Sequence, residues 1–184
     1  MAELDRSKLR LFFAAVPDVA SGNDIAAAGA ALAIGSAARL VPRNNHHMTL
    51  AFIGEVPAIQ LERVRAVGAA QRGAPFSVQF DAYEYWPKPE VIVAAARSVP
   101  AAMQTLWQRL HGDLAECGWA LTPKRLRPHV TLAKNVAQDP VLPLLAAFEW
   151  PVREFSLMRS DLGPTEAAYT EVDTWPLLDN GANA

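Results

Sequence analysis

The sequence predicts an α+β protein of two similar lobes, in which strands from the two lobes face each other across a central cleft. Two observations support this prediction. Segments with the alternation of a strand are interleaved with segments that have the apolar spacing of a helix. In addition, a short signal, His followed by a hydrophobic residue, Thr and Leu, occurs at residues 47–50 and again at residues 129–132. No linker or low-complexity tract separates the halves, so we expect a single domain over residues 1–184 made of two pseudo-symmetric lobes.

The first half of the chain predicts two strands, each followed by a helix. Residues 9–16 are an apolar run typical of a strand, and residues 18–39 are alanine-rich, which favours a helix. Residues 46–53 contain the first motif and have the pattern of a strand. Residues 58–71 predict a second helix, because Leu61, Val64 and Val67 recur at the spacing of one helical face.

The second half repeats this plan loosely. Residues 76–86 and 91–96 predict paired strands, and Pro100 marks the start of a helix that runs to Cys117, where Gly118 can cap it. The second motif strand follows. A short apolar segment at residues 141–148 and two strands at residues 152–161 and 167–175 complete the prediction.

Each motif places an imidazole and a hydroxyl on one face of a strand. Side chains alternate along a strand, so His47 and Thr49 point to one side, as do His129 and Thr131. Two imidazoles facing one pocket suit in-line displacement at phosphorus, where one takes a proton from the nucleophile and the other protonates the departing oxygen. The hydroxyls can donate hydrogen bonds to the phosphate oxygens, and no metal ion is required.

With these motifs the chain resembles the 2H phosphoesterases, which are named for two His-x-Thr/Ser motifs with a hydrophobic residue at x. The nearer resemblance is to the RNA 2′,3′-cyclic phosphodiesterase family, also called 2′-5′ RNA ligase-like. The resemblance implies a bilobal fold in which two antiparallel sheets face a central cleft, with helices on the outside. Shorter matches extend over nearly the whole chain: Arg10-Leu11-Phe12, Val41-Pro42, Gly118-Trp119, Arg127-Pro128 and Trp175-Pro176-Leu177.

The resemblance also implies roles for the motif residues. His47 would be the general acid and His129 the general base, so that His129 activates water for attack on a cyclic phosphate while His47 protonates the leaving 3′-oxygen. The product would be a 2′-phosphomonoester. Thr49 and Thr131 would hold the phosphate. The implied substrates are RNA with 2′,3′-cyclic phosphate ends or small cyclic nucleotides, without a cofactor, and 2′-5′ RNA ligation is a further activity of the family.

Three more residues are candidates for substrate binding. Many family members carry an arginine three residues after the second motif threonine, where this chain has Lys134. Lysine keeps the charge but lacks the two-pronged geometry of arginine, and on an ideal strand it would point away from Thr131, so its reach into the cleft requires a strand end or a bulge. Arg127 is a candidate for contact with a neighbouring phosphate, the alternative being a solvated side chain. Phe12 is a candidate for stacking on a nucleobase, the alternative being a place in the core.

The acidic residues of the chain avoid both motifs. The net charge of −2 predicts no general affinity for nucleic acid. However, no Asp or Glu lies between Asp24 and Glu55 or between Glu116 and Asp139, whereas several basic residues do. If the fold joins these segments, they would line one phosphate-binding cleft; the alternative is two solvated loops.

The composition is that of an ordinary globular protein. Of the 184 residues, 51% are hydrophobic and 20% are charged. The single cysteine, Cys117, cannot form an internal disulfide, and the first residues are too charged for a signal peptide. The most apolar stretch, residues 25–38, is shorter than the roughly 20 residues of a membrane span. We therefore expect a cytoplasmic monomer that does not enter a membrane.

Two other classes of function remain open from the sequence. One is a non-catalytic module for nucleotides or RNA ends, which would bind a cyclic phosphate without turnover. The other is a metal site formed by His46, His47 and His129. Against it, adjacent strand residues point to opposite faces, no acidic residue accompanies the motifs, and the spacing matches no zinc pattern. His46 is therefore expected to pack or to be exposed, and His111 to lie on the surface of the third helix.

Overall fold

The structure is a computed structural model that describes residues 7–119, 121, 125–136, 140–163 and 167–178. Within these residues, the strands form two four-stranded sheets and one two-stranded sheet, all antiparallel. The first sheet, in the order β10-β9-β1-β3, contains β1 (Lys8–Ala15), β3 (Met48–Pro57), β9 (Glu154–Leu162) and β10 (Ala167–Pro176). The second, in the order β2-β7-β6-β5, contains β2 (Arg39–Leu40), β5 (Ala82–Trp86), β6 (Val91–Ala95) and β7 (His129–Lys134). The third pairs β4 (Phe76–Phe80) with β8 (Phe148–Val152).

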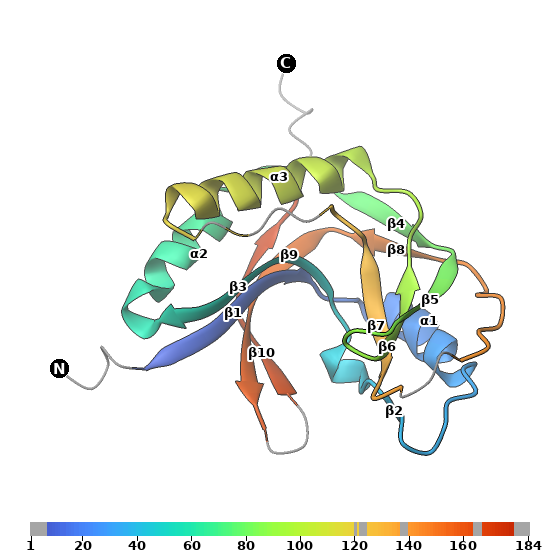
Figure 1. Cartoon of the computed structure of the whole chain (residues 1–184). Coiled ribbons are helices and arrows are strands. Elements are labelled where there is room, and N and C mark those ends of the chain that lie inside the picture. Colours follow the sequence, from blue (N-terminus) through green and yellow to red (C-terminus); the bar gives the residue numbers. More distant parts are fainter. Residues whose placement is uncertain (1–6, 120, 122–124, 137–139, 164–166, 179–184) are drawn as a thin grey trace.

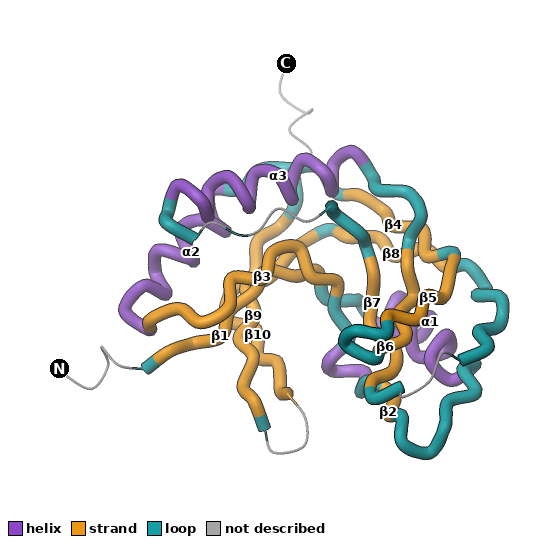
Figure 2. Tube along the Cα trace, viewed as in Figure 1, coloured by secondary structure: helices purple, strands orange, loops and turns teal. Residues whose placement is uncertain are grey.

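Helices lie on the outer sides of the sheets. α2 (Leu61–Ala70) and α3 (Ala101–Glu116) pack on the first sheet, and α1 (Val19–Ala30) packs on β7 and β8. Short 3₁₀ turns, η1 (Arg43–Asn45) and η2 (Ala58–Gln60), precede β3 and α2. Figure 1 shows the two larger sheets splayed apart below α3, and Figure 2 shows the helices at the periphery of the strands. The predicted α+β class is confirmed. No helix among the described residues is long and apolar enough to cross a membrane.

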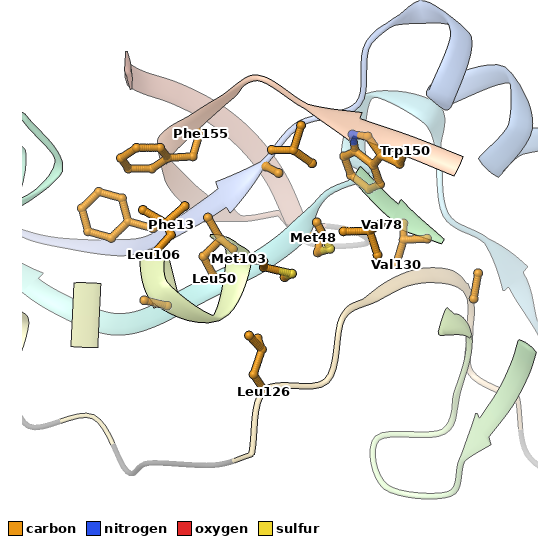
Figure 3. Close-up of a cluster of buried hydrophobic side chains, with 14 of the residues drawn as sticks. Phe13, Met48, Leu50, Val78, Met103, Leu106, Leu126, Val130, Trp150 and Phe155 are labelled. Carbon is orange, nitrogen blue, oxygen red and sulfur yellow. The ribbon is translucent and has the colours of Figure 1, made fainter. Parts of the chain in front are cut away.

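A continuous hydrophobic core connects the two larger sheets. It runs from Phe13 and Phe155 on the first sheet, past Met48 on β3, to Val130 on β7 and Trp150 on β8 (Figure 3). None of these side chains is more than 1% exposed. Met48 and Val130 are the hydrophobic residues inside the two motifs. Because both point into the core, alternation turns the His and Thr of each motif to the opposite face of its strand.

Each motif strand carries a β-bulge at the leucine of its motif. Ala14 pairs with Thr49 and Phe13 with Ala51, so Leu50 is the extra residue of β3. Likewise Val93 pairs with Thr131 and Ile92 with Ala133, which leaves Leu132 as the extra residue of β7. In each strand the leucine and the alanine after it both belong to the core. The next residue, Phe52 in β3 and Lys134 in β7, therefore returns to the face of the threonine. Because of this bulge, Lys134 lies on the same face of β7 as Thr131, which an ideal strand would not allow.

Several element boundaries differ from the prediction. The helix expected over residues 18–39 ends at Ala30, since Gly35 and Ser36 favour a loop and residues 39–40 instead pair with β7. The strand expected over residues 76–86 is two strands that diverge at Asp81 into different sheets. The apolar segment 141–148 is irregular until β8 begins at Phe148. The sequence did not indicate β8 because Pro151 is atypical of a strand interior. In the part of the chain that the structure describes, β8 pairs with β4 alone, which leaves its other edge open to a proline.

Candidate active site

The two motif histidines are held by the same local hydrogen bond. His47 Nδ1 lies 2.8 Å from the carbonyl oxygen of Asn45, and His129 Nδ1 lies 2.7 Å from the carbonyl oxygen of Arg127. In both cases the partner is the residue two positions earlier. A carbonyl oxygen only accepts, so each Nδ1 carries the proton and donates it. Each ring is thereby fixed in the tautomer whose Nε2 is free to take a proton.

The residues that supply these carbonyls are themselves anchored. Asn45 ends the turn η1, is 6% exposed, and donates from Nδ2 to the carbonyl oxygen of Ala167 in β10 at 3.0 Å. Arg127 forms an ion pair with Glu84 of β5, and its guanidinium lies 4.9 Å from the ring centre of Trp86. The orientation of each histidine therefore depends on a contact to another strand of the same sheet, β10 for His47 and β5 for His129.

Aromatic rings support both imidazoles. The His47 ring centre is 5.0 Å from that of Phe12 and 4.8 Å from that of Tyr169, while the His129 ring centre is 4.5 Å from that of Trp86. Phe12 is only 3% exposed, because the rings of His47 and Tyr169 pack against it. The stacking of Phe12 on a nucleobase stays a prediction. Phe52, by contrast, is 48% exposed on the same face of the sheet.

The cleft has two compartments, one beside each histidine. The His47 compartment has a volume of about 170 Å³ and is lined by Arg10, Phe12, His47, Thr49, Phe52, Ser160, Ala167 and Tyr169. The His129 compartment has a volume of about 720 Å³ and is lined by Thr49, Leu50, Ala51, Phe52, Trp86, Trp107, His111, Leu121, Arg125, Leu126, Arg127 and His129. Thr49 and Phe52 line both, so the compartments meet at these two residues.

The remaining sequence candidates, Thr131 and Lys134, lie on β7, although neither lines either of the two compartments. Thr131 pairs with Val93 and His129 with Ala95, which places the hydroxyl and the imidazole on one face. Lys134 follows the bulge onto this face, and its charge is among those that lower the pKa of His47. The two basic segments are only partly joined, because Arg43 donates to the carbonyl oxygen of Val19 at 2.9 Å and packs on α1 instead.

Burial favours the neutral form of both imidazoles in the free protein. The pKa of His47 is lowered to about 4, mainly by desolvation; the charges of His129 and Lys134 contribute to this shift, and the Asn45 carbonyl opposes it. Burial also lowers the pKa of His129; the Arg127 carbonyl and the Glu84 carboxylate oppose this shift, and the Arg127 charge adds to it. A bound phosphate group would favour the charged imidazole and raise both pKa values.

We expect this shift to be visible by NMR. In the free protein, the ring signals of His47 should titrate well below its ordinary pKa of 6.5, toward about 4. Added sulfate, which does not itself titrate in this range, should move the midpoint upward, since an anion in the cleft stabilises the protonated ring. The binding of sulfate should therefore tighten as the pH falls toward the free-protein pKa of about 4. A midpoint near 6.5 that does not respond to sulfate would contradict the buried placement of the ring.

The other two histidines have different environments. His46 is 5% exposed and its Nε2 lies 3.1 Å from the carbonyl oxygen of Val41, so it packs in the interior. His111 is half-buried in the His129 compartment rather than on the helix surface: its Nε2 lies 3.3 Å from the carbonyl oxygen of Leu50, and its ring centre is 4.2 Å from that of Trp107. Among the described residues, no three His, Cys, Asp or Glu side chains are grouped as metal ligands.

Sequence reasoning missed Asn45, Glu84 and Trp86, and it selected Arg127 only as a candidate for phosphate contact and not as a residue that orients a histidine. Asn45 and Arg127 occupy the same position relative to the two motifs, and that shared offset was the available signal. The sequence contains no comparable signal for Glu84 and Trp86, because only the pairing of β5, β6 and β7 brings them to His129. The place of Phe52 as the counterpart of Lys134 could have been found by aligning residues 47–52 with residues 129–134.

Two sheets that each present a His-x-Thr pair to one basic cleft define a 2H phosphoesterase, and the comparisons with known proteins agree. Residues 22–164 match the family model of the 2′-5′ RNA ligase superfamily. The chain therefore belongs to the 2′-5′ RNA ligase superfamily, as the sequence resemblance predicted. It is 34% identical to the RNA 2′,3′-cyclic phosphodiesterase of Thermus thermophilus over 74% of each chain. It is 28% identical to the protein of that name from Escherichia coli, over 77% of this chain and 81% of the other.

Solved structures show the same fold. The crystal structure of E. coli LigT complexed with 3′-AMP is 26% identical in sequence, with a TM-score of 0.82 over 93% of this chain and 99% of that chain. A second crystal structure, of a phosphoesterase, has a TM-score of 0.85 at 26% identity over 93% of this chain and 99% of that chain. The bilobal 2H phosphoesterase fold is thus confirmed.

Proposed function

We propose that this protein is an RNA 2′,3′-cyclic phosphodiesterase that works by metal-free acid and base catalysis with two histidines. The observation that carries the proposal is the matched pair of Nδ1 hydrogen bonds, which leaves Nε2 of His47 and Nε2 of His129 as proton carriers at one cleft. Two imidazoles can perform both proton transfers of an in-line displacement. The Thermus and E. coli relatives that carry this name support the assignment of the reaction.

In the proposed reaction, water loses a proton to Nε2 of His129 and attacks the phosphorus of the cyclic phosphate. The bond between phosphorus and the 3′-oxygen breaks, and His47 protonates that oxygen, leaving a 2′-phosphomonoester. Thr49 and Thr131 donate hydrogen bonds to the non-bridging oxygens, and the Lys134 ammonium offsets the charge that builds there. The negative charge of the bound phosphate favours the protonated form of His47, which is the form that this step requires.

The proposed substrates are RNA ends with a 2′,3′-cyclic phosphate and small cyclic nucleotides. The crystal structure of E. coli LigT complexed with 3′-AMP supports a ligand of nucleotide size. Arg125 and Arg127 line the His129 compartment, where they can meet further phosphates of an RNA chain. The cytoplasmic location and the monomeric state stay predictions.

The decisive experiment is turnover of an RNA oligonucleotide that ends in a 2′,3′-cyclic phosphate, in the presence of EDTA. We expect hydrolysis with all phosphate at the 2′-position, because His47 protonates the 3′-oxygen. Loss of activity with EDTA and its return with zinc or manganese would contradict the metal-free mechanism. A 3′-phosphate product would reverse the assignment of the leaving group. Tight binding of the cyclic end without turnover would instead support a non-catalytic module for RNA ends.

A further inference from the structure

The β-bulges of the two motif strands have different neighbours on their outer side. Each bulge leaves its leucine without a partner on the adjoining strand, β1 for Leu50 and β6 for Leu132. On the other side of β7, the carbonyl oxygen of Leu132 accepts a hydrogen bond from the backbone N–H of Val41, at 2.8 Å. Val41 directly follows β2, the strand that pairs with β7 there. The main chain therefore satisfies the carbonyl of the bulge in β7.

A side chain does the same for the bulge in β3. Among the described residues β3 is an edge strand of the first sheet, and α3 packs against it. The partner of the Leu50 carbonyl oxygen is Nε2 of His111 on α3, at 3.3 Å. Because a carbonyl oxygen only accepts, this Nε2 carries the proton, whereas His47 and His129 carry theirs on Nδ1. His111 thus takes the place at β3 that the backbone of Val41 takes at β7.

Leu50 lies between the two residues that join the compartments of the cleft. Thr49 precedes it, Phe52 follows two positions later, and both residues line the His47 and the His129 compartments. The bulge brings both of them to the cleft face. A shift of the backbone at Leu50 would move the hydroxyl of Thr49, and a misplacement of about 1 Å can lower a rate by on the order of 10²-fold. The contact that holds the Leu50 carbonyl therefore bears on the phosphate-binding face of β3.

We propose that His111 is a positioning residue, which fixes the bulge of β3 through its hydrogen bond to Leu50 and thereby aims the Thr49 hydroxyl at the phosphate. This inference rests on the proposed function. In this role His111 exchanges no proton with the substrate, since its Nε2 is engaged by the main chain. The ring centre of Trp107 lies 4.2 Å from that of His111, and this packing holds the imidazole in the orientation that the hydrogen bond needs.

The first test uses three substitutions of this one side chain. Glutamine places an amide nitrogen close to the position of Nε2, asparagine places one close to Nδ1, and leucine has no donor. On adenosine 2′,3′-cyclic phosphate, His111→Gln should keep kcat/KM within about threefold of the wild type. His111→Asn and His111→Leu should lower it about tenfold. Thermal unfolding gives the folded fraction of each variant, and the comparison of the two amides remains decisive if the leucine variant does not fold. A glutamine variant no more active than the asparagine variant would overturn the proposal.

A double-mutant cycle with Thr49→Ala tests whether the effect passes through Thr49. If it does, His111→Leu should lower kcat/KM by less than about twofold once the hydroxyl is absent, against about tenfold when the hydroxyl is present. His111→Asn replaces His111→Leu in the cycle if the leucine variant does not fold. An equal loss in both backgrounds would mean that His111 contacts the substrate or only supports the fold, and the proposal would be wrong.

Sulfate binding and NMR separate this inference from the proposed function. The affinity for sulfate, measured by calorimetry, should fall about threefold or more in His111→Asn but not in His111→Gln, because the Thr49 hydroxyl helps to hold the anion. NMR of the wild-type protein should show the ring proton of His111 on Nε2. If the cyclic phosphate is not consumed at all, the proposed function fails, yet these two results would still establish that His111 positions Thr49. An unchanged sulfate affinity in His111→Asn, or a ring proton on Nδ1 of His111, would refute the inference itself.

Discussion

Replacing either motif histidine with alanine is expected to lower the turnover of a cyclic phosphate by about 10²- to 10⁴-fold, the usual contribution of a general acid or base. His47 and His129 each move one proton in the same step, so neither can compensate for the other. The substrate affinity should fall far less, because the threonines and Lys134 still bind the phosphate. Steady-state kinetics of the purified variants, with kcat and KM determined separately, measures the effect.

His46→Ala is the matched control for these variants, since it removes the same side chain one position away. His46 is buried and hydrogen-bonded to Val41, so this variant should lose stability while it keeps nearly wild-type turnover per folded molecule. Thermal unfolding of all three variants shows how much protein is folded in each assay. A loss of turnover in His46→Ala as large as that in His47→Ala would show that the two residues are wrongly assigned to the core and the cleft.

The pattern of the motifs predicted the faces of the strands correctly because the core enforces it. Met48 and Val130 are fully buried, and a strand that buries the residue inside each motif must turn the flanking His and Thr away from the core. The alternation of apolar and polar residues along the sequence of a strand therefore indicates which side chains face the core. For the same reason the helices over residues 58–71 and 100–117 were predicted within a few residues of α2 and α3.

The path of the chain beyond the motifs was less predictable, because it depends on pairing between distant segments. Residues 39–40 become a strand only through β7, and the carbonyl oxygen of the bulged Leu132 accepts a hydrogen bond from the backbone N–H of Val41 at 2.8 Å. Asp81 divides β4 from β5 because its backbone N–H and carboxylate bond to Ala95 and Arg97. None of these contacts is local in sequence, so no local pattern records them.

Two nearly identical motifs contribute to a cleft whose two sides differ in chemistry. Residues 47–51 and 129–133 differ only at the hydrophobic position, and both strands bulge at the leucine. The first difference in chemistry comes at the next position on the cleft face, where β3 has Phe52 and β7 has Lys134. One lobe therefore supplies an exposed ring where the compartments meet, and the other supplies a cation whose charge reaches His47.

Lys134→Ala is accordingly expected to lower kcat/KM by about 10- to 100-fold on both a cyclic mononucleotide and an oligonucleotide. A hydrogen bond to a charged group contributes about 1.5 to 3 kcal/mol, and each 1.4 kcal/mol corresponds to about tenfold. The loss should be equal on the two substrates because Lys134 is expected at the scissile phosphate, which both contain. Lys134→Arg should retain most of the activity, since arginine keeps the charge and adds a two-pronged donor.

Arg39→Ala tests whether Lys134 acts by contact or only by its positive charge. Arg39 is the exposed partner of Lys134 across the pairing of β2 with β7, but its charge is not among those that shift the pKa of His47. We expect Arg39→Ala to lower kcat/KM by less than about threefold and to lose even this effect at high salt, where exposed charges are screened. Equal losses in Arg39→Ala and Lys134→Ala would indicate that the general positive field of β7 and β2 attracts the substrate. An unchanged Lys134→Ala enzyme would show that the bulge at Leu132 does not bring the ammonium to the phosphate.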